Sequence, residues 1–226
     1  MYMEHWSEAI PFWKELTHAQ QSVLSAAARE RDVPKGTLLH GGSQDCVGLL
    51  VVRRGRLRAY TLSDEGKELT LYRLQAGEIC LFSAACIFGG VELDVLVEAE
   101  EDTATLHIPS DVYQNLMETS IAAANYTNRL MAGRFSDVMW LMDQVLNKKL
   151  DARLAALLLE ERDLRHSDAL NITHEQLGNH LGSVREVVTR MLKHFQGEGW
   201  VSLRRGCIHL TDLRALRALA AASIRA

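Results

Sequence analysis

Residues 173–210 read THEQLGNHLGSVREVVTRMLKHFQGEGWVSLRRGCIHL, and this stretch decides the fold of the C-terminal part of the chain. Thr173 and Gln176 have the spacing of a capping box, in which a hydroxyl caps a helix and the Gln three residues later reaches back. Ser183 and Glu186 repeat this spacing, and Gly182 stands where a tight turn would fall. The pattern predicts a helix, a short turn and a second helix.

The second predicted helix has two different faces. At about 100° per residue, a stripe roughly 140° wide is apolar; it consists of Val184, Val187, Val188, Met191, Leu192 and Phe195. The opposite face carries Arg185, Glu186, Thr189, Arg190 and Lys193. Guanidiniums, a carboxylate and a hydroxyl near a helix N-terminus are groups with which recognition helices contact base edges. We interpret this face as DNA-reading; the alternative is a solvated face of salt bridges.

A hairpin is predicted after the second helix, which Gly197 and Gly199 end. Residues 200–203 and 207–210 are β-type runs, and residues 204–206 form the turn between them. Such a hairpin is a wing, with Arg204 and Arg205 at its tip within reach of phosphates. A terminal helix is expected over 213–224.

The chain upstream of residue 110 has a β texture. Residues 47–52 are a continuous apolar run typical of a buried strand, residues 56–62 alternate, and residues 64–66 (Asp-Glu-Gly) indicate a turn. Several short strands at regular spacing predict a small barrel or jelly roll. Residues 7–30 are predicted to form a helix, with Ser7 as its cap.

Residues 110–148 are predicted to form one long helix that begins after Pro109. Seven of its residues follow a 4-3 spacing: Ala124, Asn128, Met131, Phe135, Val138, Met142 and Val145. This is an a/d seam with one polar position of the kind that fixes register. A helix packed on its own barrel is the alternative, but we favour a dimer interface, because two-fold-related helices suit palindromic sites.

The charge distribution fits a small DNA-binding region at the C-terminal end of an otherwise acidic chain. The 226 residues have a net charge of −4, yet residues 151–226 hold 11 Lys and Arg against 9 Asp and Glu. No apolar run could span a bilayer, and the N-terminus does not resemble a secretory signal. We expect a cytoplasmic protein without membrane contact, whose four cysteines are thiols.

In this order of parts, the chain resembles the Crp/Fnr family of bacterial transcription regulators. The glycine punctuation at Gly36, Gly41-Gly42, Gly55, Gly66 and Gly77 and the segment 182–192 (GSVREVVTRML) carry the resemblance. It implies an α+β fold with a sensory cyclic-nucleotide-binding-like roll over 1–109, a dimerisation helix over 110–148 and a winged helix-turn-helix over 149–226. It also implies a homodimer that binds double-stranded DNA and works with RNA polymerase, and not an enzyme.

The resemblance extends to single residues of the recognition helix. Arg185, Glu186 and Arg190 match the trio with which the cyclic-AMP receptor branch reads a G-T-G-A core, and Thr189 stands where the Fnr branch has a serine. We expect an operator like TGTGA, because Arg185 favours guanine in the outer position; a half-site of the Fnr type is the alternative that Thr189 leaves open. The expected DNA-contacting set is Thr173, Ser183, Arg185, Glu186, Thr189, Arg190, Lys193, Arg204 and Arg205.

The signal that the barrel senses is less constrained. The family's cyclic-nucleotide pocket needs an Arg-Ser pair after Gly77-Glu78, and no arginine lies between Arg73 and Arg129, so the sequence disfavours cyclic AMP. An iron–sulfur cluster is disfavoured because no cysteine precedes Cys46. Haem or another small molecule stays open, with candidate ligands His5, His18, His40 and His107.

Cys80 and Cys86 are candidates for redox or reactive-sulfur sensing, since two thiols near a dimer contact could form a bridge. The alternative is packing, because cysteine behaves as a small hydrophobe. A metal site would need further ligands, and none is predicted. A barrel enzyme is disfavoured because the chain has neither His-x-His nor Gly-x-Ser-x-Gly; a ligand-binding module without DNA is disfavoured by the complete winged motif.

Overall fold

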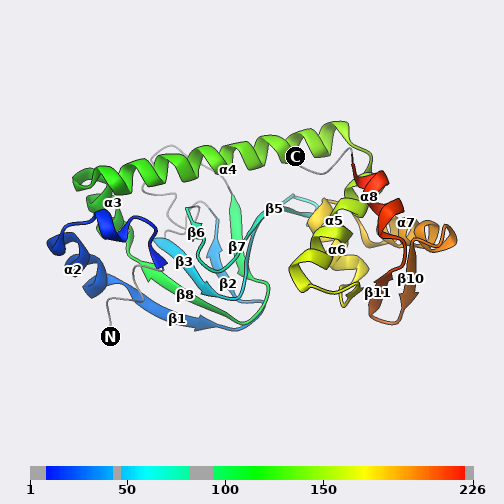
Figure 1. Ribbon diagram of the computed structural model, residues 1–226, viewed down its shortest axis with the longest axis horizontal. Helices are drawn as coiled ribbons and strands as arrows, with labels where there is room; N and C mark the ends of the chain where they lie inside the picture. Colours follow the sequence, from blue (N-terminus) through cyan, green and yellow to red (C-terminus); the bar gives the residue numbers. More distant parts are fainter. Residues whose placement is uncertain (1–8, 43–46, 82–93, 222–226) are drawn as a thin grey trace. The chain divides into compact units, whose positions relative to one another are not determined.

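The computed structural model describes residues 9–42, 47–81 and 94–221. The chain divides into two compact units, the first formed by Met1–Thr61 and Leu71–Asp137, the second by Leu62–Thr70 and Val138–Ala226. Helix α4 (Ile121–Asn147) contributes residues to both units (Figure 1). Among the described residues, no helix has the length and apolar character needed to cross a membrane.

The strands upstream of residue 110 form a roll of two four-stranded sheets, as the sequence predicts, and most of this roll belongs to the first unit. The first sheet has the order β1 (Arg29–Val33), β8 (Thr103–Ile108), β3 (Leu49–Arg54), β6 (Ile79–Cys80); the second has β2 (Leu38–Gly41), β7 (Val95–Ala99), β4 (Leu57–Leu62), β5 (Glu68–Leu74). Strand β8 pairs antiparallel with β1 and β3, and β7 pairs antiparallel with β2 and β4.

The continuous apolar run at β3 is explained by burial of both of its faces. Leu50 and Val52 pack against Leu57 and other residues of the second sheet. Leu49 and Val51 point the other way and pack against the helices that cover the first sheet. Because successive side chains of a strand alternate between faces, a strand covered on both sides must be apolar throughout.

The N-terminal helix is shorter than predicted. A 3-10 turn, η1 (Trp13–Glu15), is followed by α2 (His18–Ala27), and Arg29 already belongs to β1. The helix starts late because Thr17 caps it: the Thr17 side chain accepts from the Gln20 amide, and the Gln20 side chain accepts from the Thr17 amide. Ser7, the predicted cap, lies outside the described residues.

The predicted helix over 110–148 is two helices. Helix α3 (Ser110–Thr119) ends at Ser120, whose backbone is extended (φ −128°, ψ 111°), and α4 begins at Ile121. The Ser120 hydroxyl accepts from the Ala123 amide, so it satisfies a free donor at the start of α4. A buried hydrogen bond of 2.7 Å between the hydroxyls of Tyr113 and Thr127 joins the two helices.

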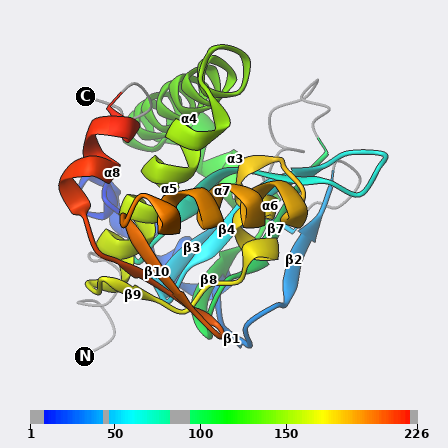
Figure 2. The same ribbon diagram turned by 90° about the vertical axis from the view of Figure 1, so that its right-hand side faces the viewer.

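The second unit contains the winged helix-turn-helix that the sequence predicts (Figure 2). Its elements are α5 (Leu150–Arg165), β9 (Ala169–Leu170), α6 (His174–Leu181), α7 (Arg185–Gly197), β10 (Val201–Arg204), β11 (Cys207–Leu210) and α8 (Leu213–Ala220). Its core includes the fully buried Leu158, Leu192 and Phe195. The short β9 was not predicted; Leu170 pairs with Ile208, which adds a third strand to the wing. Residues 222–226, the end of the predicted terminal helix, lie outside the described residues.

Candidate nucleic-acid interface

The first helix of the motif is capped as predicted. The Thr173 hydroxyl accepts from the Gln176 amide (3.1 Å), and the Gln176 side chain accepts from the Thr173 amide (2.9 Å). Gly182 ends α6 with φ +67°, a left-handed conformation that favours glycine. Thr173 therefore has a structural role in starting the helix, in addition to its predicted DNA contact.

The second capping box, by contrast, is not formed. Helix α7 begins at Arg185, its N-cap is Val184, and no side chain caps it. The reason is the turn: the Ser183 amide donates to the carbonyl of Gly178 (2.9 Å), which holds Ser183 outside α7. A Cβ at Gly178 would lie 2.8 Å from the Ser183 carbonyl oxygen, so this turn depends on the glycine. Gly178 was not predicted as a structural residue, although a glycine inside a predicted helix is a signal.

Helix α7 has the predicted two faces, with one exception. Val188, Leu192 and Phe195 are fully buried, and Val187 and Met191 are partly buried. Val184 is exposed (41%), because it precedes the helix and so does not share the stripe's direction. On the opposite face, four charged side chains are exposed: Arg185, Glu186, Arg190 and Lys193.

Thr189 lies on the polar face but is held in place by two contacts. Its hydroxyl donates to the Arg185 carbonyl (2.8 Å) and lies 2.8 Å from the Nδ1 atom of His174. Burial, and then the positive charge of Arg185, lower the pKa of His174. His174 thus orients a residue of the candidate interface, a role that the sequence alone does not reveal.

Two further basic groups extend this surface. Arg204 and Arg205 are exposed at the end of the β10–β11 hairpin, where Arg204 pairs with Cys207. Lys149 lines a hollow of about 460 Å³ together with Arg190 and His194, between the start of α5 and α7. Lys149 was not predicted as a site residue, because it stands in the short connection between two helices. Of these cations, Lys149 lies beside Arg190 in this hollow, and Arg204 and Arg205 are exposed at the end of the hairpin.

The predicted seam of α4 is largely exposed in the single chain. Asn128, Met131, Phe135, Met142 and Val145 are exposed, Phe135 to 69%, and Ala124 and Val138 are half-buried. Met139 and Leu146, which were not predicted, lie on the same side of the helix and are exposed as well. An exposed apolar stripe of this length on a helix indicates an interaction surface.

The described effector candidates of the first unit differ in burial. Cys80 is fully buried in the core between the sheets, while Cys86 lies outside the described residues. His40 is buried, His18 is exposed and His107 contacts the Val47 carbonyl; His5 is outside the described residues. Within residues 9–42, 47–81 and 94–221, no group of three or more His, Cys, Asp or Glu is placed to hold a metal ion.

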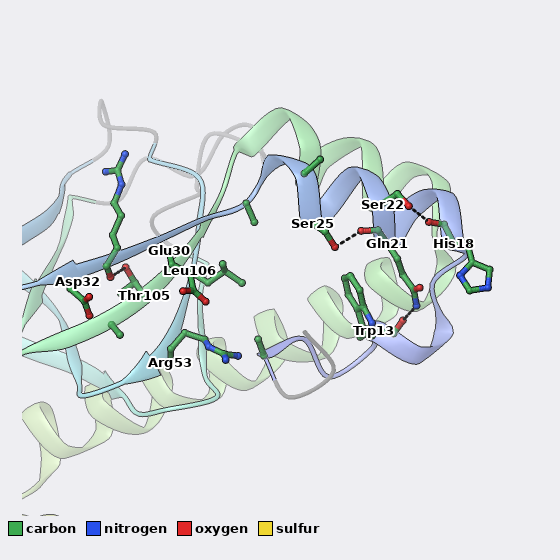
Figure 3. A pocket seen from close by; sticks show the side chains of 15 residues that line it. Trp13, His18, Gln21, Ser22, Ser25, Glu30, Asp32, Arg53, Thr105 and Leu106 are labelled. Carbon is green, nitrogen blue, oxygen red and sulfur yellow. Dashed lines mark hydrogen bonds between the residues drawn. The ribbon is translucent and has the colours of Figure 1, made fainter. Parts of the chain in front are cut away.

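A groove of about 1020 Å³ lies in the first unit between α2 and strands β1, β3 and β8 (Figure 3). Three of its polar side chains already have partners: Ser22 and Ser25 donate to the carbonyls of His18 and Gln21, and Gln21 donates to that of Trp13. Groups satisfied within the protein do not by themselves select a ligand.

Comparison with known proteins matches both units. Residues 30–120 match the cyclic nucleotide-binding domain, and residues 152–219 match the Crp-like helix-turn-helix domain. A solved structure assigned to the Crp/Fnr family of transcriptional regulators, from Eubacterium rectale, is 49% identical with a TM-score of 0.92, covering 94% of this chain and 99% of that one.

Two curated relatives agree with this match. The fumarate and nitrate reduction regulatory protein of Salmonella typhimurium is 26% identical over 90% of this chain and 83% of its own length. The transcriptional regulator SdrP of Thermus thermophilus is 29% identical over 75% of this chain and 82% of its own length.

Proposed function

Since the chain belongs to the Crp/Fnr family of transcription regulators, we propose that it is a homodimer that reads a palindromic TGTGA-like operator under the control of a signal in its roll. The observation that carries this proposal is the exposed polar face of α7, whose opposite face is anchored by the fully buried Val188, Leu192 and Phe195. RNA polymerase is the partner through which the bound dimer would act on transcription.

The exposed side chains of α7 support the proposal that the protein reads a TGTGA-like operator. Arg185 and Arg190 are exposed guanidiniums, and arginine pairs in a bidentate manner with the O6 and N7 atoms of guanine. Glu186, also exposed, can accept from the N4 amino group of cytosine. Lys149, Arg204 and Arg205 would contact phosphates, which fix the position of the protein without reading sequence.

The exposed stripe of α4 supports the dimer. Phe135, Met142 and Leu146 leave much of their apolar surface in water in the single chain, and a second copy of the helix would bury it. A two-fold pair of chains would present two α7 helices to two half-sites.

For the signal, the position of Cys80 favours packing over thiol sensing. Cys80 is fully buried and so is not open to solvent, whereas sensory thiols are exposed. Sensing at Cys80 and Cys86 therefore stays a prediction that an oxidation experiment tests, beside the alternative of haem or another small molecule.

The test is fluorescence anisotropy of a labelled duplex that carries TGTGA-N6-TCACA, against a scrambled duplex of the same composition. Reduced protein should bind the operator selectively, and the affinity should fall with rising salt. A change after mild oxidation would support the cysteines, and equal selective binding in both states would assign them to packing. Equal affinity for operator and scrambled duplex would contradict the operator, and selection from random DNA would then follow.

A further inference from the structure

Inside the first unit, a guanidinium from α4 reaches the roll. The Arg134 guanidinium lies over the ring of Tyr72, with its central carbon 4.3 Å from the ring centroid. Its Nη2 atom donates to Glu78 (3.2 Å) and its Nη1 atom to Asp137 (3.3 Å). The Arg134 side chain is only 14% exposed. Arg134 therefore connects the helix to strand β5 and to the turn that precedes β6.

On the side of the roll, hydrogen bonds position the turn that carries Glu78. Glu78 also accepts from the Gln75 amide (2.7 Å), and the Gly77 amide donates to the Val52 carbonyl, with Gly77 at φ +88°. These bonds fix the turn and therefore the Glu78 carboxylate. Burial, and then the neighbouring Cys80, raise the pKa of Tyr72 well above its usual range, so the ring under the guanidinium is a neutral phenol.

The charge of Arg134 is balanced by the chain itself. Burial lowers the pKa of Arg134, but its neighbours, among them the Glu78 and Asp137 carboxylates, outweigh burial and raise it. The guanidinium is therefore fully charged and faces two carboxylates. With this balance, the cluster does not attract an anionic ligand.

We propose that Arg134, Tyr72 and Glu78 form a clasp that holds α4 against the roll in the DNA-binding arrangement without any added small molecule. This rests on the proposed function, in which the roll acts on DNA binding through α4. The clasp links the roll to the helix through side chains of the protein itself. If the partly buried charge of Arg134 left its partners, it would lose the interactions that compensate for its burial. The clasp thereby favours one packing of α4 over others.

The experiment uses the full-length protein and the operator and scrambled duplexes, without added effector. We expect Arg134→Ala and Glu78→Gln each to weaken operator binding at least tenfold while the protein stays dimeric by sedimentation. The double variant should be no weaker than either single one, because both break the same contact. Arg129→Ala, on an exposed arginine of the same helix, is the matched control and should change the affinity less than twofold.

Arg134→Lys keeps the test decisive if Arg134→Ala fails to fold. Lysine keeps the charge but not the planar fork, so this variant should fold and show an intermediate loss of affinity. Unchanged operator affinity in the Arg134 variants, or a loss equal to that of Arg129→Ala, would overturn the clasp while leaving the proposed function intact. Tighter binding would also overturn it, because the clasp would then hold a non-binding arrangement. Wild-type protein without operator selectivity would instead contradict the proposed function itself.

Discussion

At the scale of single residues, the polar face of α7 combines free and restrained side chains. Arg185, Glu186 and Arg190 are exposed and can adapt to a base edge, whereas Thr189 is fixed by His174 and by the Arg185 carbonyl. A restrained hydroxyl between adaptable charged groups limits the sequences that fit, because an unpaired polar group at a DNA interface costs affinity.

We predict that Arg190→Ala weakens operator binding by about 1–3 kcal/mol and relaxes discrimination at one base pair of each half-site. The reason is the loss of a bidentate guanine contact, which a water molecule replaces only in part. Anisotropy with the operator and with single-substituted operators measures both effects. Arg214→Ala, on an exposed arginine of α8, is the control. An equal loss on operator and scrambled DNA would show that Arg190 contacts only phosphate.

We predict that acid destabilises the protein in part through His174. Its pKa is lowered in the folded state, so the stabilisation is present above the unfolded value of about 6.5 and is lost as the pH falls through the folded value. The pKa of His107 is also lowered by burial and then by Arg31, so His174→Asn should reduce, not abolish, the fall in Tm between pH 7.5 and 5.5. Circular dichroism measures Tm, with the exposed His209→Asn as control; an undiminished fall would refute the role of His174.

Spacing along the chain predicts the role of a residue correctly when only its sequence neighbours determine the local structure. It fails when a contact with a more distant residue determines that structure. The Thr173–Gln176 box forms as predicted because both partners lie within one helical turn. The Ser183–Glu186 box has similar spacing but does not form, since a bond to Gly178 holds Ser183 in the turn. His174 and Arg134 act on residues from other elements, and no spacing along the sequence reports such contacts.

At the scale of elements, α4 shows which part of a helix prediction depends on tertiary structure. The heptad spacing predicts the exposed apolar side, although Met139 and Leu146 widen it beyond the a/d positions. The break at Ser120 was not predicted, because no glycine or proline marks it and the cap is a single hydroxyl. Since α4 begins after this break and continues for 27 residues, its whole apolar side lies on one continuous helix.

We predict that Phe135→Glu converts the dimer to a monomer. A carboxylate in the middle of the stripe would have to be buried without a partner when two helices pair, which costs more than the lost apolar contact. Sedimentation velocity at micromolar concentration measures the effect. Ser136→Glu adds the same charge one residue further along, on an exposed position beside the stripe, and should remain dimeric. A dimeric Phe135→Glu protein would place the interface elsewhere.

At the scale of the whole molecule, a dimer reads DNA by the distance between two recognition helices. TGTGA-N6-TCACA places the centres of its half-sites about one helical turn apart, so both lie on one face of the duplex. Inserting five base pairs, to give an N11 spacer, turns the half-sites to opposite faces. One dimer could then engage only one of them unless it twisted the DNA or its own helices.

We therefore predict that the N11 duplex binds at least tenfold more weakly than the N6 duplex, a difference of about 1.4 kcal/mol or more, and about as strongly as a duplex with a single half-site. Anisotropy at fixed salt measures all three affinities, because the phosphate contribution must stay equal. The Phe135→Glu protein is the internal control: as a monomer it should bind the N6 and N11 duplexes equally. Equal binding by the wild-type protein would mean that its two recognition helices act independently, and the operator would then be read one half-site at a time.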